Sequence, residues 1–229
     1  MRDFLFVMAD EFAKQRIKSQ IWVHDHNICH IKKHVRPLLK DARLRKAIDA
    51  VAWHDYEGNP AEMGALAREF PELPMYHTER SHYSLEGMAS ILYLLNQGCR
   101  GHNHWTTIQD EYGAPHQYFG GSEKTTSPVA EGHLPALVAP RKKPNAWRAT
   151  LGHEFFKHLT VHVHRGAAVL PAVSKDTGPN CAAFRNVDGR IVLVAVNREK
   201  KAKKFRVVLG EAEARLTLPA RSVGTYCFY

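Results

Sequence analysis

Four segments of the sequence end in polar and aromatic side chains of the kinds that act on sugars. A carboxylate can attack or protonate an acetal centre. Aromatic rings stack on the C–H faces of a pyranose, and polar groups form hydrogen bonds with its hydroxyls. In chain order, the candidate residues are Asp25, His54, Tyr56, Glu79, Asn103 and Trp105.

Each candidate also has a purely structural explanation. Glu79 could favour the positive N-terminus of a following helix, and Asp25 could cap the next segment. His54 and Tyr56 could be core residues with satisfied polar atoms, and Trp105 could serve packing alone. The recurrence of the pattern at all four segment ends favours a functional interpretation.

Helical and strand-like segments alternate over the first two thirds of the chain. The patterns predict helices at 2–15, 35–47, 61–70 and 83–97, and strands at 19–25, 47–56, 73–79 and 99–105. This alternation is typical of a parallel sheet with helical crossovers. Ligand sites of α/β barrels lie at the C-terminal ends of the strands, where the candidates fall. Four strands do not close a barrel, so either the sheet is open or the front half of a barrel is absent.

The remainder of the chain has a different composition and a different secondary-structure pattern. A stretch rich in Gly, Pro, Ser and Thr at about 106–144 predicts a long functional loop, and 145–158 has a helical pattern. Short β-type segments follow, and Asp188-Gly189 marks a hairpin turn between two of them. His162 and His164 alternate with valines, which is typical of the solvent-exposed face of a strand. We therefore expect a partial barrel over 1–155 and an antiparallel β-sandwich over 156–229.

Composition excludes several classes of protein. The net charge is +9, and basic residues cluster at 40–46, 141–143 and 200–204. We interpret these clusters as solvated helix faces and turns, and we expect the cluster at 200–204 to lie at the tip of a hairpin. Because no aromatic-rich motif accompanies these clusters, nucleic acid is not expected as a partner. No apolar run is long enough for an integral membrane segment, and the N-terminus predicts an amphipathic helix, not a signal peptide.

Cysteine and histidine spacing bear on metal binding. The four cysteines form no CxxC pair, which argues against a zinc knuckle or a dense disulfide framework. His26, His30 and His34 are spaced i, i+4, i+8 like a stripe of zinc ligands, but no HExxH motif accompanies them. We expect no metal and no cofactor in the site; a metal-dependent hydrolase remains an alternative.

Several segments, in order, resemble the C-terminal half of a family 30 glycoside hydrolase of the glucosylceramidase type. IWVHDHN, AVAWHDYEGNP, FPELPMYHTE and GHNHWTTIQDEYGAPH resemble strands five to eight of that family's barrel. LGHEFFKHLTVHVHRGAAVL resembles the return into the sandwich, and FRNVDGRIVLVAVNR and LPARSVGTYCF resemble its final strands. The implied fold is α/β plus β: strands 5–8 of a (β/α)8 TIM barrel followed by a β-sandwich module.

The resemblance implies a retaining β-glycosidase that acts on a carbohydrate or glycolipid such as a β-glucoside. Glu79 would be the nucleophile, Tyr56 would donate a hydrogen bond to it, and His54 would lie nearby. Asp25, Asn103 and Trp105 would hold the sugar.

The sequence departs from the family pattern in places. Asp55 stands where the family has an aromatic residue, Thr106 where glucosylceramidases often have Asn, and His104 where some members carry an acid. The acid/base Glu of the family lies in an Asn-Glu pair, which this sequence does not contain. We therefore expect a partial chain, inactive alone, with a complementary N-terminal half as a partner. The alternative is a non-catalytic carbohydrate-binding or interaction protein.

Overall fold

The computed structural model describes residues 2–82, 84–114, 135–171 and 181–229. Two compact units make up the chain. The first comprises Met1–Arg80 and Gln97–Asn103, and the second comprises Ser81–Asn96 and His104–Tyr229.

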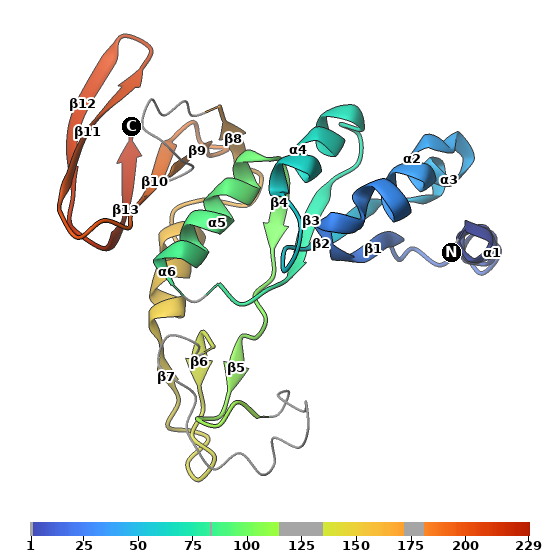
Figure 1. Ribbon diagram of the computed structural model, residues 1–229, viewed down its shortest axis with the longest axis horizontal. Coiled ribbons are helices and arrows are strands. Elements are labelled where there is room, and N and C mark those ends of the chain that lie inside the picture. Colours follow the sequence, from blue (N-terminus) through green and yellow to red (C-terminus); the bar gives the residue numbers. More distant parts are fainter. Residues whose placement is uncertain (1, 83, 115–134, 172–180) are drawn as a thin grey trace. The chain divides into compact units, whose positions relative to one another are not determined.

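A four-stranded parallel sheet forms the centre of the first unit. Its order is β1 (Trp22–Asn27), β2 (Ala50–His54), β3 (Met75–Glu79) and β4 (Cys99–His102), as Figure 1 shows. Helices α1 (Arg2–Lys14) and α4 (Pro60–Glu69) confirm the predicted alternation. Four residues of β2 in succession are buried, as expected for an inner strand of a parallel sheet that is covered on both faces.

The helical segment after β1 differs from the single helix predicted at 35–47. It begins earlier, as the 3₁₀ turn η1 (Ile28–His30) and the π-helical turn η2 (Ile31–Val35), and continues as α2 (Arg36–Lys40). A separate helix, α3 (Ala42–Ala47), then starts at Asp41, whose carboxylate accepts hydrogen bonds from the backbone N–H groups of Arg43 and Leu44. Asp41 has extended backbone angles, so it ends one helix and caps the next.

The second unit is built on antiparallel β-structure. One sheet has the order β13 (Ser222–Phe228), β10 (Ile191–Asn197), β9 (Cys181–Arg185) and β8 (Ala168–Leu170); the other pairs β11 (Lys203–Leu209) with β12 (Ala212–Leu218). Helix α5 (Leu85–Asn96) packs against β9 and β10, and α6 (Leu151–Thr160) packs against β13. The apolar core consists of residues from α5, β9 and β10, among them Leu92, Phe184 and Val194. The predicted turn at Asp188-Gly189 is confirmed between β9 and β10, with Gly189 at a φ of 87°.

Two predictions about the β-segments are wrong. His162 and His164 do not lie on a strand, because α6 continues to Thr160 and a turn follows it. The Asn186 side chain fixes this turn by accepting from the His164 N–H and donating to the His162 carbonyl. The lysines at 200–204 do not mark a hairpin tip, since β10 pairs with β9 and β13 while β11 pairs with β12.

The predicted loop at about 106–144 contributes two strands to a small sheet. Its flanks form β5 (Ile108–Gln109) and β6 (Leu137–Val138), which join β7 (Arg148–Ala149); residues 115–134 lie outside the described part. The helix predicted at 145–158 starts instead at Leu151, because Thr150 caps it by accepting from the Gly152 N–H. The predicted domain boundary at residue 155 stays a prediction. Among the described residues, no helix has the length and apolar character that spanning a bilayer requires.

Candidate active site

His54 lies between two carboxylates at the C-terminal edge of the parallel sheet. Its Nε2 is 3.2 Å from Oδ1 of Asp25, and its Nδ1 is 3.7 Å from Oε1 of Glu79. The strand register explains this meeting, because His54 pairs with Asn27 of β1 on one side and with Glu79 of β3 on the other. A neutral imidazole can donate to one of these carboxylates, and a protonated one to both.

A bulge in β1 directs Asp25 toward His54. The β1–β2 register passes from His24 to His26 and skips Asp25, and both His24 (φ 86°) and Asp25 (φ 50°) have positive φ angles. Such strain in residues other than glycine persists only where surrounding contacts hold it. The Thr78 hydroxyl provides one such contact, at 2.6 Å from Oδ1 of Asp25. Thr78 is a site residue that the sequence reasoning missed, although it precedes Glu79 directly.

Tyr56 and Asn103 lie in the same unit. The ring centre of Tyr56 is 6.2 Å from that of His54, and the Arg80 guanidinium lies 5.6 Å from the Tyr56 ring centre. Arg80 also donates to the backbone carbonyl of Asp55. The Asn103 N–H donates to the His77 carbonyl at 2.8 Å, which continues the β3–β4 pairing and leaves the Asn103 side chain exposed. Arg80 was not singled out from the sequence.

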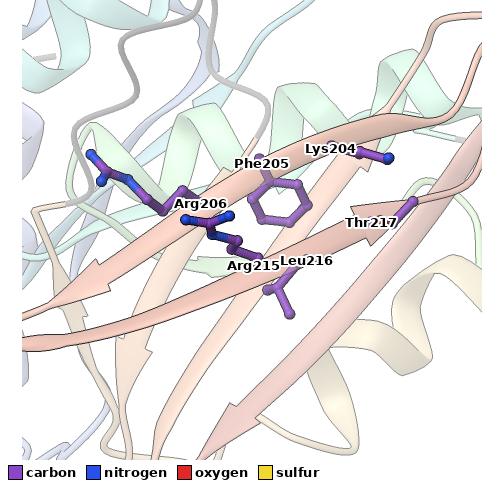
Figure 2. Close-up of a pocket in the computed structure, with 6 residues that line it drawn as sticks. All are labelled: Lys204, Phe205, Arg206, Arg215, Leu216 and Thr217. Atoms are coloured by element: carbon purple, nitrogen blue, oxygen red, sulfur yellow. The ribbon is translucent and has the colours of Figure 1, made fainter.

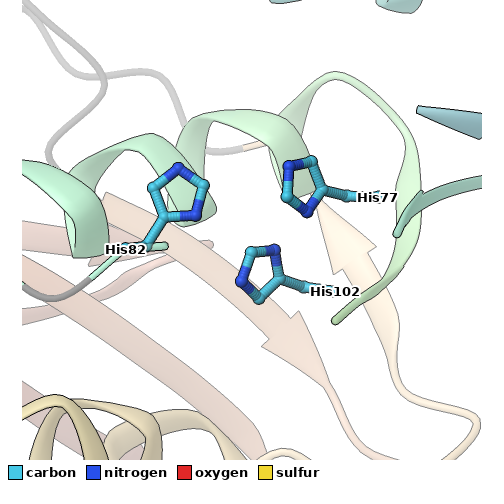
Figure 3. A group of neighbouring side chains, drawn as sticks. All are labelled: His77, His82 and His102. Carbon is cyan, nitrogen blue, oxygen red and sulfur yellow. The ribbon is translucent and has the colours of Figure 1, made fainter. Parts of the chain in front are cut away.

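Asp55 is buried and pairs with His77. The His77 Nε2 lies 2.8 Å from the Asp55 Oδ1, and their side chains are 0% and 6% exposed. The His77 ring stacks on that of His102, with centres 4.4 Å apart and planes inclined by 15° (Figure 3). The third residue labelled in Figure 3, His82, belongs to the second unit. Asp55, which stands where the family resemblance predicts an aromatic residue, thus forms a buried polar contact with His77.

Trp105 belongs to the second unit, with 40% of its surface exposed. The Ser81 hydroxyl donates to its carbonyl. The structure therefore brings Asp25, His54 and Glu79 into contact and places Tyr56 and Asn103 in the same unit. The proximity of Trp105 to them stays a prediction.

A shallow pocket of about 600 Å³ lies on β11 and β12 of the second unit. Phe205 and Leu216 are opposite one another across the two strands, as are Arg206 and Arg215 (Figure 2). Both arginines contact Glu213, at 3.2 and 3.3 Å. Lys204 and Thr217 complete the lining.

Comparison with known proteins supports the family resemblance. Residues 172–226 match the model of the glycosyl hydrolase family 30 beta sandwich domain, a region that includes β9 to β12 and most of β13. No curated protein matches the sequence.

Solved structures match nearly the whole chain. The endo-beta1,6-glucanase BT3312 has a TM-score of 0.79 and 23% identity over 99% of this chain and 52% of its own. SrfJ from Salmonella typhimurium has a TM-score of 0.79 and 21% identity over 96% of this chain and 50% of its own. A GH30 endoxylanase from Clostridium papyrosolvens C71 has a TM-score of 0.65 and 12% identity over 97% of this chain and 59% of its own.

The TM-scores establish a likeness of fold, and at these identities the likeness is one of fold alone. The chain spans between one half and three fifths of the length of these three structures. The sequence of the last module and the fold of nearly the whole chain are therefore similar to those of the C-terminal half of a family 30 glycoside hydrolase, as the sequence motifs indicated.

Proposed function

We propose that this chain is the nucleophile-bearing part of a retaining β-glycosidase. The observation that carries the proposal is the position of Glu79, at the end of β3 with its carboxylate 3.7 Å from His54, which in turn contacts Asp25. In this proposal β1 to β4 are strands 5–8 of a (β/α)8 barrel, and their C-terminal ends line the sugar-binding pocket.

Each site residue has a role in the proposed reaction. Glu79 attacks the anomeric carbon and forms a glycosyl-enzyme, which water then hydrolyses. His54 holds the Glu79 carboxylate in position, and Asp25, fixed by Thr78, orients His54. Tyr56 donates a hydrogen bond to Glu79, and Asn103 and Trp105 bind the sugar.

The proposed reaction needs a second carboxyl group as acid/base, about 5–5.5 Å from the nucleophile. Because the sequence contains no Asn-Glu pair, we propose that a complementary N-terminal half supplies this group. Without that half, the leaving group departs unprotonated, and the loss of general acid catalysis lowers the rate by about 10²–10⁴-fold.

We propose a β-linked glycan as the substrate. The names of two similar structures, an endo-beta1,6-glucanase and an endoxylanase, support a polysaccharide more than the glucosylceramide that the sequence motifs suggested.

A mechanism-based label tests the proposal on this chain alone. A 2,4-dinitrophenyl 2-deoxy-2-fluoro-β-glucoside carries a leaving group that needs no protonation, and the fluorine slows hydrolysis of the glycosyl-enzyme. We expect peptide mass spectrometry to find the label on Glu79. Glu79→Gln should remain unlabelled, whereas Glu57→Gln, a control at an exposed glutamate, should be labelled as the wild type is. Labelling at a residue other than Glu79 would remove Glu79 from this role.

A non-catalytic carbohydrate-binding protein is the second candidate, and the pocket on β11 and β12 favours it. Phe205 offers an aromatic surface there, and Lys204, Arg206 and Thr217 offer hydrogen-bond donors. In this case Phe205→Ala should abolish binding of β-glucan or xylan oligosaccharides in calorimetry, and Glu79→Gln should leave it unchanged. The opposite pattern would favour the glycosidase.

A further inference from the structure

One face of the β11–β12 hairpin has more positive than negative side chains. Successive residues of a strand point to opposite faces of a sheet, and along both strands exposed residues alternate with half-buried ones. We call the exposed side the arginine face. Its residues are Lys204, Arg206, Val208, Glu213, Arg215 and Thr217. Three basic side chains therefore share this face with one carboxylate.

Two arginines of this face lie directly opposite one another. Arg206 of β11 pairs with Arg215 of β12 (Figure 2), and like charges opposite one another across two strands repel. Glu213 offsets part of the repulsion, because its Oε2 lies 3.2 Å from Nη1 of Arg206 and its Oε1 lies 3.3 Å from Nε of Arg215. One carboxylate balances only one of the two guanidinium charges, so the pair stays positive.

The two guanidinium groups have donors left for a ligand. A guanidinium has five N–H donors, and the contact with Glu213 uses one nitrogen of each arginine. The side chains of Arg206 and Arg215 are 63% and 89% exposed, so a ligand from solvent can reach them. The planar guanidinium fork matches a carboxylate and forms two parallel hydrogen bonds with it. A ligand that carries carboxylates therefore suits this pair.

The positive charge continues along the chain, which favours a polymer over a single small anion. Seven basic and three acidic residues lie in the segment from Arg198 to Arg215. Lys203, on the other side of β11, pairs with Glu199 at 3.6 Å. Lys204, on the arginine face, forms no ion pair with any of the residues that the structure describes. Its charge is about 6.6 Å along the strand from that of Arg206, at two residues' rise.

The composition of the hairpin disfavours two other polyanions. Single-stranded nucleic acids stack their bases on aromatic rings, but Phe205 turns to the opposite side, where its ring centre is 5.8 Å from that of Tyr226. An anionic membrane would meet the acidic Glu211 in the turn between the strands, beside the exposed Leu209. Thr217, opposite Lys204, offers a hydroxyl that can bond with sugar hydroxyls.

We propose that the arginine face binds a carboxylated polysaccharide, a polymer that contains uronic acid residues. Arg206 and Arg215 bind its carboxylates, Lys204 adds electrostatic attraction, and Thr217 contacts its hydroxyls. The arginine face lies in the second unit and includes none of the candidate catalytic residues. The proposal is therefore independent of the role of Glu79, and its test requires no catalytic activity.

Binding of the full chain to immobilised polygalacturonate tests the proposal. We expect binding that weakens as NaCl is added, because salt screens exposed charges. The methyl ester of the same polymer, which keeps the sugars and removes the charges, should not bind. Combining Arg206→Gln with Arg215→Gln should weaken binding at least about tenfold, because two charge-assisted contacts are lost.

The matched control combines Arg165→Gln with Arg185→Gln. Both positions are exposed and belong to the second unit, so this variant loses the same charge away from the arginine face. It should bind as the wild type does. An equal loss of affinity in the control and in the Arg206/Arg215 variant would mean that net charge alone attracts the polymer, and would overturn the proposal.

Other results would also overturn it. These are no binding by the wild type, wild-type affinity in the Arg206/Arg215 variant, and equal binding of the methyl ester. Tighter binding to duplex DNA or to phosphatidylserine vesicles, at equal charge concentration, would assign the face to another macromolecule. Circular dichroism shows whether each variant is folded. If the Arg206/Arg215 variant is misfolded, Lys204→Gln decides: we expect weaker binding, and wild-type affinity there overturns the proposal.

Discussion

The Nε2 of His77 lies 2.8 Å from the Oδ1 of Asp55, joining β3 to the residue that follows β2. Both side chains are buried, so neither can replace its partner with bulk water. Removing one member of such a pair leaves a buried polar group without that contact, which costs about 3 kcal/mol or more.

Asp55→Ala should therefore lower the free energy of unfolding by about 3 kcal/mol, and Asp55→Asn by less, since an amide can still accept a hydrogen bond. Urea unfolding followed by circular dichroism measures both values. Glu72→Gln is the control, because Glu72 forms an exposed ion pair with Arg45 and should change the value by less than about 1 kcal/mol. Equal stabilities of Asp55→Ala and Glu72→Gln would contradict the prediction.

His158 should make stability depend on pH. Burial lowers the pKa of His158 below its usual value, and the neighbouring His162 lowers that pKa further. Between the two pKa values the unfolded chain binds more protons than the folded chain, so stability rises with pH. The contribution of His158 is fully present above about pH 6.5 and is lost as the pH falls toward the folded-state pKa.

The thermal unfolding midpoint should therefore fall between pH 7.5 and pH 5.5, and should fall less in His158→Gln. Glutamine can retain the hydrogen bond that His158 makes with the Thr225 hydroxyl, so the comparison isolates the titration. His153→Gln, on the same helix, serves as the control. A steeper pH dependence in His158→Gln than in the wild type would mean that the sign is wrong.

Cys99 should resist thiol reagents in the folded chain. Burial raises the pKa of the Cys99 thiol to about 11, so very little thiolate is present at neutral pH, and only 2% of the residue is exposed. Cys29 is exposed and should be alkylated first. Peptide mapping after timed iodoacetamide treatment should show Cys29 modified long before Cys99, and urea should remove the difference. Early modification of Cys99 without urea would refute its burial.

Asn197 should stabilise the junction between β10 and β12. Its side-chain NH₂ donates to the carbonyls of Lys201, Leu218 and Pro219, and its Oδ1 accepts from the Glu199 N–H. Asn197→Ala should cost about 2–3 kcal/mol of unfolding free energy, because it removes the four hydrogen bonds that this buried side chain makes with the backbone. Asn197→Asp should cost more, since a carboxylate cannot donate to the three carbonyls.

Asn145→Ala, at an exposed asparagine, is the matched control for this measurement and should stay within about 0.5 kcal/mol of the wild type. A loss of stability in Asn197→Ala no larger than that of Asn145→Ala would show that the junction does not depend on this side chain.

The sequence by itself determined the alternation of helices with parallel strands, the later antiparallel strands and the strand ends on which the candidate residues lie. These features depend on local patterns: apolar periodicity, turn residues such as Asp188-Gly189, and polar residues that follow an apolar run. The strand assignment therefore predicted that His54 and Glu79 lie at the same edge of the sheet. The register of β2 and β3 places them opposite one another.

Only the tertiary structure decided how the site is held. The bulge that turns Asp25 toward His54 and the Thr78 contact that fixes it depend on pairing between segments far apart in sequence. The same is true of the buried Asp55–His77 pair and of the break between α2 and α3, where capping by Asp41 overrides a continuous helical pattern. Local sequence specifies which elements form. The spacing and burial of their side chains arise only when the chain packs, because each contact joins residues whose proximity no single segment encodes.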